Sequence, residues 1–498
     1  MRSSADIAEG GSVASTGGSG PAGNAAPQAL AARWRRLLAI VRRPIAPDTR
    51  AALARAWARV PARLRVSRQF LGRQYAGCGA TIGAMPRCDF ACAGCYLNEH
   101  ANEASPLPFA ALVEQMSQLR AWLGDGGNLQ LTDGEVTLRP TDELVALVRA
   151  ARELGLVPML FTHGDTFRRR PGMLERLMVE GGLRELSIHI DSTMRGRRGH
   201  KTAGGADPLL GLRDEFAALI RAARAATARP LDVATTYTAT ADNLGAVPAV
   251  MRWLLANPGV FKMISFQPVA QVGRTADGLG GTVSVEALWR RIAEGLFGDA
   301  GAVSVLLRDQ QWFGHPECSR FVQGVIVGGV GEAPRFHPLV RGDDARDQAA
   351  MMAAMRHFGG ATLRNDTPLE AVVRTAALLA RHPGFVVRHA LPWLWRTARR
   401  LDSRPGRLVW GWLRGRVRLS YLNLVSHHFM SAAELSTALG RERADLCVFK
   451  VAIDGELRSM CEVNAQGGRE RFYDQLRAAS RSSAGVVGPI ASALSLTA

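Results

Sequence analysis

From Thr81 to Tyr96 the chain reads TIGAMPRCDFACAGCY, an apolar run that leads into three cysteines. Cys88, Cys92 and Cys95 follow a C-x3-C-x2-C spacing within one short loop. Three thiolates on such a loop can bind three irons of a cubane [4Fe–4S] cluster, for which cysteine is the usual ligand. The fourth iron then has no nearby protein ligand, and an open metal position is typical of a catalytic site.

A zinc site or a chance grouping is the alternative interpretation of these cysteines. Zinc sites usually combine two C-x2-C pairs, or one such pair with histidines at matching spacing. The histidine nearest to the loop is His100, and the sequence contains no second C-x2-C pair. The pattern downstream of the loop favours the iron–sulfur interpretation.

Apolar segments typical of strands alternate with amphipathic helical segments from Thr81 onward. We predict strands at Thr81–Met85, Leu129–Thr132, Pro158–Thr162, Glu185–Ile190, Leu231–Tyr237 and Lys262–Gln267. We predict helices at Phe109–Leu123, Thr141–Leu154, Gly172–Val179, Asp214–Ala226 and Leu244–Ala256. Such alternation predicts an α/β fold of parallel strands joined by crossover helices. Six units make a partial (βα)6 TIM-like barrel, whose chemistry belongs at the C-terminal ends of the strands, where the cysteine loop falls.

The second predicted strand ends in Leu131-Thr132-Asp133-Gly134-Glu135. This stretch and the cysteine spacing resemble those of the radical S-adenosylmethionine (radical SAM) enzymes. In that family S-adenosylmethionine chelates the open iron, and an electron from the cluster cleaves it to a 5′-deoxyadenosyl radical that abstracts hydrogen from the substrate. The resemblance implies that Gly134 and Glu135 bind the amino group of S-adenosylmethionine, since a carboxylate suits an amine. Asp133 stands where the family has a first glycine.

The fourth predicted strand runs into Ser187-Ile188-His189-Ile190-Asp191. Polar and apolar residues alternate here, so we expect Ser187, His189 and Asp191 to share the face that points into the barrel. The family resemblance, which covers about residues 76–275, implies that Ser187 and Asp191 contact the ribose and carboxylate of S-adenosylmethionine. An interior histidine satisfied by its neighbours is the alternative interpretation of His189.

The composition indicates a globular enzyme in a reducing compartment. The chain has 498 residues, enough for two or three domains, and 47% of them are hydrophobic. Seven cysteines, three of them in one loop, argue against a disulfide framework. The first 28 residues lack the apolar core of a signal peptide and are expected to be disordered. With no run of 18 apolar residues, we predict a cytoplasmic protein, peripheral on the inner face of the membrane.

Positive charge is concentrated in two arginine-rich blocks that together dominate a net charge of +18. Thirteen arginines lie between Arg2 and Arg73, and ten lie between Arg381 and Arg418. The second block also holds Trp393, Trp395, Trp410 and Trp412. Arginine interleaved with Trp, Leu and Val on helices is typical of a helix in a bilayer interface. A solvated or core-packing face and an RNA-binding surface are the alternatives, although no RRM, KH or zinc-finger pattern supports RNA.

Four cysteines, Cys78, Cys318, Cys447 and Cys461, lie outside the loop. Scattered buried thiols are one interpretation, because free cysteine is often buried. Cys447 and Cys461 flank a predicted hairpin with an Asp454-Gly455 turn, which would bring its two ends together. The four residues can therefore complete a second, auxiliary [4Fe–4S] cluster, unless Cys78 is a bystander beside the first cluster.

The C-terminal motifs carry a closer resemblance, to the radical SAM tetraether lipid synthases and their bacterial relatives. The motifs are His315-Pro316-Glu317-Cys318, His428-Phe429 and Cys461-Glu462-Val463-Asn464. The resemblance implies a lipid chain as substrate, C–C bond formation or a related lipid modification, and an auxiliary cluster. This chain departs from the pattern of those enzymes at two places. Their cysteine-rich N-terminal segment is reduced here to Cys78, and Ser459-Met460 stands where Pro-Phe is expected before the last cysteine.

These patterns together predict six segments. They are a disordered N-terminus at 1–28, a basic helical segment at 29–75, the radical SAM partial barrel at 76–275, a connecting region at 276–345, the Arg/Trp-rich helices at 346–420 and an α+β cysteine-hairpin region at 421–498. We expect a radical SAM enzyme supplied with electrons by a reducing donor such as flavodoxin or ferredoxin, with nucleic acid disfavoured as a partner. A radical SAM peptide or protein maturase is one alternative, and a non-enzymatic iron–sulfur or zinc protein that binds RNA or membrane is another.

Overall fold

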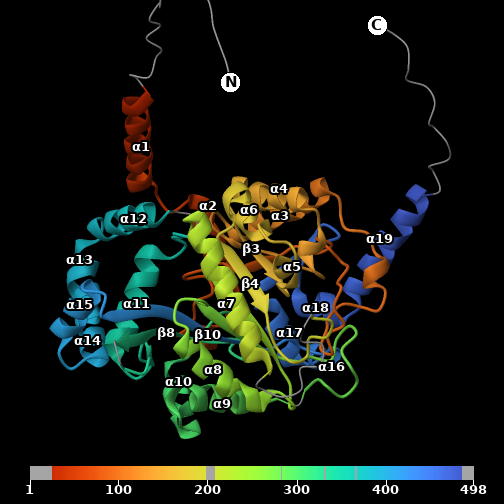
Figure 1. Ribbon diagram of the computed structural model, residues 1–498. Coiled ribbons are helices and arrows are strands. Elements are labelled where there is room, and N and C mark those ends of the chain that lie inside the picture. The colour runs from red at the N-terminus through yellow and green to blue at the C-terminus, as the bar shows by residue number, and fades with distance from the viewer. Residues whose placement is uncertain (1–24, 198–207, 282, 330–331, 365–366, 485–498) are drawn as a thin grey trace, which may run out of the picture.

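The computed structural model describes residues 25–197, 208–281, 283–329, 332–364 and 367–484, drawn in colour in Figure 1. Within these residues the chain forms a mixed α/β fold around one curled sheet of twelve strands. The strands follow the order β12-β11-β1-β2-β3-β4-β5-β6-β10-β8-β7, and β9 pairs with β8 outside that path.

Six strands at the centre of the sheet run parallel and follow the chain order. They are β1 (Cys78–Ala80), β2 (Asn128–Leu131), β3 (Val157–Thr162), β4 (Glu185–His189), β5 (Asp232–Ala239) and β6 (Met263–Pro268). The helices between them are α3 (Phe109–Leu123), α4 (Thr141–Glu153), α5 (Asp165–Arg169), α6 (Met173–Arg176), α7 (Pro208–Thr227) and α8 (Val247–Ala256). The prediction of an α/β fold with parallel strands is confirmed.

The first strand differs from the prediction, because Cys78–Ala80 pairs in the sheet and Thr81–Met85 does not. The backbone N–H of Ile82 donates to Gln115 Oε1 at 3.1 Å, and that of Gly83 donates to Asp133 Oδ2 at 2.8 Å. Gly83 has a φ of 77°, which turns the chain out of the extended conformation. Ile82 is nonetheless fully buried, so its apolar character imitates a strand.

Strands from the C-terminal half extend both edges of the parallel set. On one side β11 (Phe449–Ile453) pairs parallel with β1, and β12 (Glu456–Ser459) pairs antiparallel with β11. On the other side β10 (Val417–His427) pairs parallel with β6 and antiparallel with β8 (Ser319–Gly329). Asp454 and Gly455 have φ values of 52° and 77°, which confirms the predicted β11–β12 hairpin turn. The short strands β7 (Gln311–Trp312) and β9 (Arg335–Pro338) complete the sheet.

Helices cover the outer face of the sheet and also gather in a separate group (Figure 1). The N-terminal helices are α1 (Ala25–Arg42) and α2 (Pro47–Arg59), so residues 25–28 of the predicted disordered segment begin α1, and residues 1–24 lie outside the described residues. After β6 come α9 (Val285–Phe297), α10 (Val303–Asp309), α11 (Ala345–Phe358), α12 (Pro368–Ala380), α13 (Pro383–Phe385), α14 (Leu391–Leu401) and α15 (Pro405–Leu413). The last four are α16 (Ala432–Leu435), α17 (Ala438–Asp445), α18 (Met460–Ala465) and α19 (Gly468–Ala484).

The main core fills the space between the parallel strands and their crossover helices. Leu119 of α3, Leu131 of β2, Leu160 of β3 and Leu186 of β4 are fully buried there. Burial of one such side chain contributes about 1.5–3 kcal/mol, so this layer fixes the strand ends that carry the site. None of the helices in the described part of the chain combines the length and the apolar character needed to cross a bilayer.

Candidate active site

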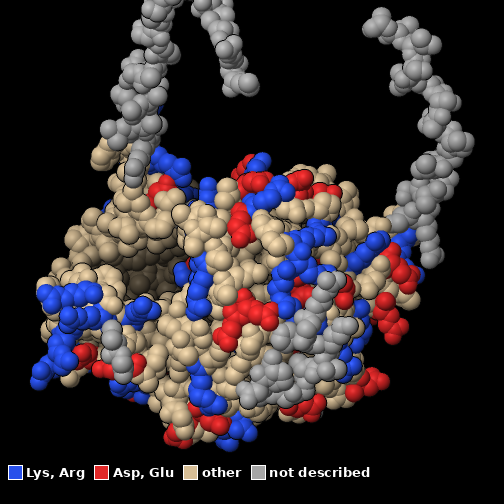
Figure 2. Space-filling model, in the orientation of Figure 1, with Lys and Arg blue, Asp and Glu red and all other residues tan. Residues whose placement is uncertain are grey.

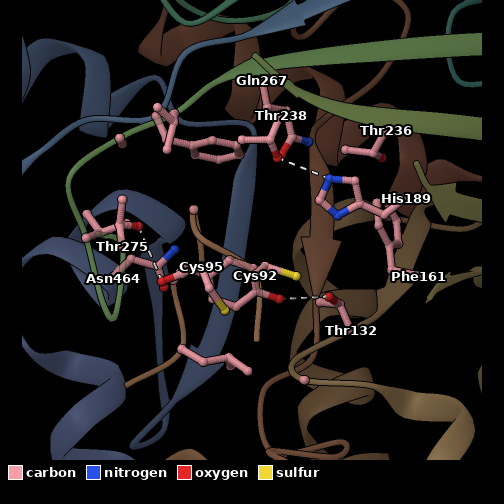
Figure 3. A pocket seen from close by; sticks show the side chains of 18 of the residues that line it. Cys92, Cys95, Thr132, Phe161, His189, Thr236, Thr238, Gln267, Thr275 and Asn464 are labelled. Carbon is pink, nitrogen blue, oxygen red and sulfur yellow. Dashed lines mark hydrogen bonds between the residues drawn. The ribbon is translucent and has the colours of Figure 1, made fainter. Parts of the chain in front are cut away.

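A cavity of about 220 Å³ lies at the C-terminal ends of the parallel strands, where the barrel rule places chemistry (Figure 3). Of the residues predicted for the catalytic cluster and S-adenosylmethionine, six line it: Cys88, Cys92, Cys95, Gly134, Glu135 and Ser187. Cys461 and Asn464 of α18 also line this cavity, so the C-terminal region closes one of its walls.

The cysteine loop is held in place by the loop that follows β4. The backbone N–H of Ala91 donates to the Arg195 carbonyl at 3.0 Å, and that of Ala93 donates to the Thr193 carbonyl at 2.8 Å. The N–H of Cys88 donates to Asn102 Oδ1 at 2.9 Å. These bonds keep three free, partly exposed thiols on one wall of the cavity.

The spacing of the three thiols does not match that of three ligands of a single zinc ion. Zinc–sulfur bonds of about 2.3 Å in a tetrahedron place sulfur atoms roughly 3.8 Å apart. In the described part of the chain, the one group of three candidate ligands whose atoms lie within 4.8 Å of one another is Cys88, Asp89 and His163. Cys88, Cys92 and Cys95 therefore do not converge on one small ion, whereas a cubane binds each thiolate at a different iron.

Asp89 and His163 of this group belong to a hydrogen-bond network of the protein. His163 Nε2 lies 2.8 Å from Asp89 Oδ1, and its ring stacks on Phe90 with centroids 3.9 Å apart. Arg169 Nη2 donates to Asp89 Oδ2 at 2.7 Å. The hydrogen bond from His163 holds the pKa of Asp89 well below its usual range. The Asp89 carboxylate therefore already has two partners in the protein, His163 and Arg169.

Burial shapes the electrostatics of the thiols. Burial, together with the neighbouring Cys95, raises the pKa of Cys92 to about 12. Burial also raises the pKa of Cys88 above its ordinary value. Arg274 is a cation beside the thiols. Burial alone would lower its pKa, but the interaction with Cys95 raises the pKa overall. Because thiolates are the metal-binding form, metal binding at this loop must release protons.

Gly134 lets two backbone segments approach closely. A Cβ atom at this position would lie 2.4 Å from the Arg87 carbonyl oxygen and 2.5 Å from that of Pro86. The Gly134 N–H donates to the Met85 carbonyl at 2.8 Å, which ties the β2 loop to the segment before the cysteines. The absence of a side chain therefore keeps the neighbouring Glu135 beside the cysteine loop.

Glu135 is a buried carboxylate fixed by donors from two strand ends. It accepts the Thr137 N–H at 3.1 Å, the Thr162 hydroxyl at 2.6 Å and the His163 N–H at 2.8 Å. The side chain lines the cavity with its orientation set by these bonds. An anionic acceptor held in this way suits a cationic amine of a ligand.

Residues of β4 divide between the cavity wall and its support. Ser187 lines the cavity, with its hydroxyl 3.0 Å from that of Thr236, and His189 lines it as well. Asp191 is not among the residues that line the cavity, and its contact with a cofactor stays a prediction. Its carboxylate accepts the N–H groups of Thr193 and Thr238 at 2.8 and 2.7 Å and lies 2.5 Å from His189 Nε2. Asp191 therefore orients His189 from behind.

The four remaining cysteines occupy different environments. Cys461 lines the cavity and accepts the Met430 N–H at 3.4 Å, while Cys447 donates to the Phe449 carbonyl at 3.0 Å. Cys318 accepts from Arg443 Nε at 3.1 Å. Cys78 donates to Asn128 Oδ1 at 2.8 Å and faces a second cavity below the first.

Sequence reasoning missed several polar residues of the cavity. Thr132, Thr236, Thr238 and Gln267 lie on the inward face near the ends of β2, β5 and β6 (Figure 3). Thr238 donates to or accepts from His189 Nε2 at 3.1 Å. Their position at the ends of predicted strands was the available signal, because the polar residues at those ends project into a barrel.

The comparisons with known proteins found partial likeness of fold. No family model matches the chain, and no curated protein matches it. Crystal structures of Streptococcus suis SuiB are among the similar solved structures. The structure bound to S-adenosylmethionine is 15% identical with a TM-score of 0.30, and it covers 44% of this chain and 46% of SuiB. A second SuiB structure is 14% identical with the same TM-score, and it covers 44% of this chain and 45% of SuiB. The likeness therefore spans less than half the length of either protein.

Proposed function

We propose that this chain is a radical SAM enzyme whose β1–β6 units form the partial (βα)6 barrel of the active site. One observation carries the proposal: three thiols of a C-x3-C-x2-C loop after β1, the Gly134-Glu135 turn after β2 and Ser187 within β4 meet in one cavity. Polar residues gathered at the C-terminal ends of parallel strands are the usual construction of a catalytic site in this architecture.

In this proposal Cys88, Cys92 and Cys95 hold a [4Fe–4S] cluster. Glu135 accepts the amino group of S-adenosylmethionine, Gly134 keeps that carboxylate against the cysteine loop, and Ser187 contacts the rest of the molecule. When both are bound, the cluster would supply the electron for reductive cleavage of S-adenosylmethionine, and the resulting 5′-deoxyadenosyl radical would abstract hydrogen from the substrate. The protein orients both groups, excludes water and takes electrons from a small donor such as flavodoxin or ferredoxin.

A lipid chain is the substrate that the surface of the protein supports best. Val387, Leu394, Trp395, Trp410 and Trp412 of the α13–α15 region are more than half exposed. Arginines flank them, and Figure 2 shows blue side chains around this end of the molecule. Tryptophan and arginine on amphipathic helices suit the interface of an anionic bilayer, so we propose a peripheral enzyme.

An auxiliary cluster would draw on Cys318, Cys447 and Cys461. The backbone N–H of Met460 bonds to Cys447, and the charges of Cys447 and Cys318 both affect the pKa of Cys461, which burial raises. This electrostatic influence of the thiols on one another supports the proposal of a common site. The Cys78 sulfur is hydrogen-bonded to the Asn128 and Gln130 side chains of β2, so we leave it out of this cluster.

The proposal is tested by iron and sulfide per chain after anaerobic reconstitution, together with 5′-deoxyadenosine formed from S-adenosylmethionine under reducing conditions. The wild type should hold four irons per cluster, and replacement of Cys88, Cys92 and Cys95 by alanine should remove one cluster and all 5′-deoxyadenosine. Cys78→Ala is the matched control and should keep both. Full turnover in the triple variant, or bound zinc in place of iron, would refute the proposal.

A further inference from the structure

The segment that follows β6 lies against the cysteine loop. The Arg274 N–H donates to the Leu97 carbonyl at 2.8 Å. The Ala276 N–H donates to the Ala93 carbonyl at 2.9 Å. Because Cys95 lies between these two acceptors in the sequence, the segment is fixed to the loop on both sides of this cysteine.

Close packing and a side-chain hydrogen bond add to these contacts. A Cβ atom at Gly273, whose φ is 56°, would lie 2.4 Å from the Tyr96 carbonyl oxygen. The Thr275 hydroxyl donates to the Cys95 carbonyl at 3.4 Å (Figure 3). The backbone on both sides of Arg274 therefore sets the position of this residue relative to the thiols.

The Arg274 side chain lies beside the cysteine loop but outside the cavity. Its Nη2 donates to the carbonyl of Phe90, which lies between the first two cysteines, at 3.1 Å. Val272 and Thr275 of the same segment line the cavity, whereas Arg274 does not. The guanidinium therefore approaches the loop from outside the space that a ligand can occupy.

The charge of Arg274 acts chiefly on the three thiols. Burial lowers the pKa of Arg274, but Cys95, Cys88 and Cys92 raise it more, and no described carboxylate is among the groups that raise it. A partly buried cation is unfavourable unless an anion lies beside it. The anion that suits this cation is the cysteine loop itself in its metal-binding thiolate form.

A cluster bound by three thiolates is anionic and becomes more so on reduction. A [4Fe–4S]2+ core with three thiolates carries one net negative charge, and uptake of an electron adds a second. A fixed positive charge nearby stabilises the reduced form more than the oxidised form, because the attraction grows with the charge of the cluster. Net charge and hydrogen bonds to the sulfurs are among the factors that set the reduction potential of such clusters.

Glu135 has the opposite effect from the cavity side of the loop. Burial raises the pKa of Cys88, and the charge of Glu135, which lines the cavity, raises it further. A carboxylate at this distance disfavours added negative charge on the loop. Arg274 is placed to offset this effect.

We infer that Arg274 raises the reduction potential of the cluster held by the cysteine loop and so eases reduction by the electron donor. Its charge acts on the cluster and not on S-adenosylmethionine, because the side chain lies outside the cavity. The inference rests on the proposed function for the identity of the cluster.

Redox titration of the anaerobically reconstituted full-length protein, followed by EPR without S-adenosylmethionine, tests this inference. The signal to follow is the one that Cys92→Ala removes. Arg274→Gln should lower the ratio of reduced to oxidised cluster at least about tenfold at a fixed potential, which is a midpoint potential lower by about 59 mV for one electron. Arg274→Lys keeps the charge and should stay within about threefold of the wild type. Arg290→Gln, which removes an exposed arginine from α9, is the matched control and should change nothing.

The possible outcomes separate the charge of Arg274 from other roles. An unchanged potential in Arg274→Gln together with weaker binding of S-adenosylmethionine would overturn the inference and assign the residue to the cofactor. An equal shift in Arg274→Lys or Arg290→Gln would overturn it as well, since the charge at this position would not be the cause.

A further variant covers the case in which Arg274→Gln takes up no iron. The midpoint potential of Arg274→His should fall more steeply than that of the wild type between about pH 6 and about pH 8, because the imidazole loses its charge there. The same pH dependence in both proteins would refute the inference. A wild type without a redox-active iron cluster would refute the proposed function as well, whereas 5′-deoxyadenosine formation with equal potentials in all variants would remove this inference alone.

Discussion

Replacement of Arg469 by methionine should disconnect the C-terminal helix α19 from the candidate cofactor site. Arg469 Nη1 and the Tyr473 hydroxyl both bond to Asp133 Oδ1, and the Gly83 N–H donates to Asp133 Oδ2 at 2.8 Å. The Asp133 side chain is fully buried and that of Arg469 is 3% exposed. Removal of one partner from a buried pair costs about 3–5 kcal/mol of unfolding free energy, because the other charge is left uncompensated.

The backbone at Asp133 makes the prediction sharper. Its φ is 143°, a conformation that L residues rarely adopt and that costs about 1–3 kcal/mol. The double variant Asp133→Gly/Arg469→Met removes the buried charge and the backbone strain together. We therefore expect the double variant to be destabilised by at least about 2 kcal/mol less than the sum of the two single variants.

Urea unfolding of the four proteins measures this coupling, and the affinity for S-adenosylmethionine shows whether the site moves with it. Arg469→Met should weaken that affinity, because Asp133 precedes Gly134 and Glu135 and its carbonyl accepts the Tyr96 hydroxyl beside the cysteine loop. Arg471→Met is the matched control on the exposed face of α19 and should change stability by less than about 0.5 kcal/mol. Additive single effects, or an Arg469→Met protein as stable as the wild type, would refute the reasoning.

Three further predictions follow from the site and the surface. Gly134→Ala should lower the free energy of unfolding by more than about 2 kcal/mol and abolish 5′-deoxyadenosine formation, because the added Cβ would lie 2.4–2.7 Å from backbone oxygens. Wild-type activity in this variant would show that the β2 loop is free to move. The pKa of His427 is lowered in the folded protein, so as the pH drops the unfolded chain takes up this proton before the folded one does. The free energy of unfolding should therefore fall as the pH drops from about 6.5 toward 3. His427→Leu should reduce the slope of the unfolding free energy against pH, measured by urea unfolding, by up to about 1.4 kcal/mol per pH unit. Trp410→Ser/Trp412→Ser should reduce co-sedimentation with phosphatidylglycerol vesicles, whereas unchanged binding would place the membrane contact elsewhere.

The sequence predicted the parallel strands well because their apolar runs and the amphipathic periods of α3 and α4 are local properties. It misplaced the first strand, because the turn at Gly83 depends on donors and acceptors from Gln115 and Asp133. It gave no indication that β10 and β11 join the same sheet, since those pairings link residues far apart in the chain.

The candidate site likewise combines residues that local sequence patterns identify with residues that only long-range contacts bring to it. The cysteines, Gly134, Glu135 and Ser187 are identifiable because each follows or lies within a recognisable strand. The contribution of Arg469 is not, because the ion pair with Asp133 joins residues 336 positions apart. Asp191, two residues past the end of β4, bonds to His189 and does not line the cavity, an arrangement that the local alternation of polar and apolar residues does not reveal.

The pairing of β1 with β11 has a consequence for biosynthesis. β1 is synthesised early, but its neighbour β11 and the helix α19 follow much later in the chain. Until then β1 has an open edge, and such edges promote association between chains. The cysteine loop likewise lacks one wall of its cavity until α18 has been synthesised, so in the proposed enzyme iron should bind only after that point. Chains that end before residue 449 should therefore accumulate as insoluble, iron-free protein.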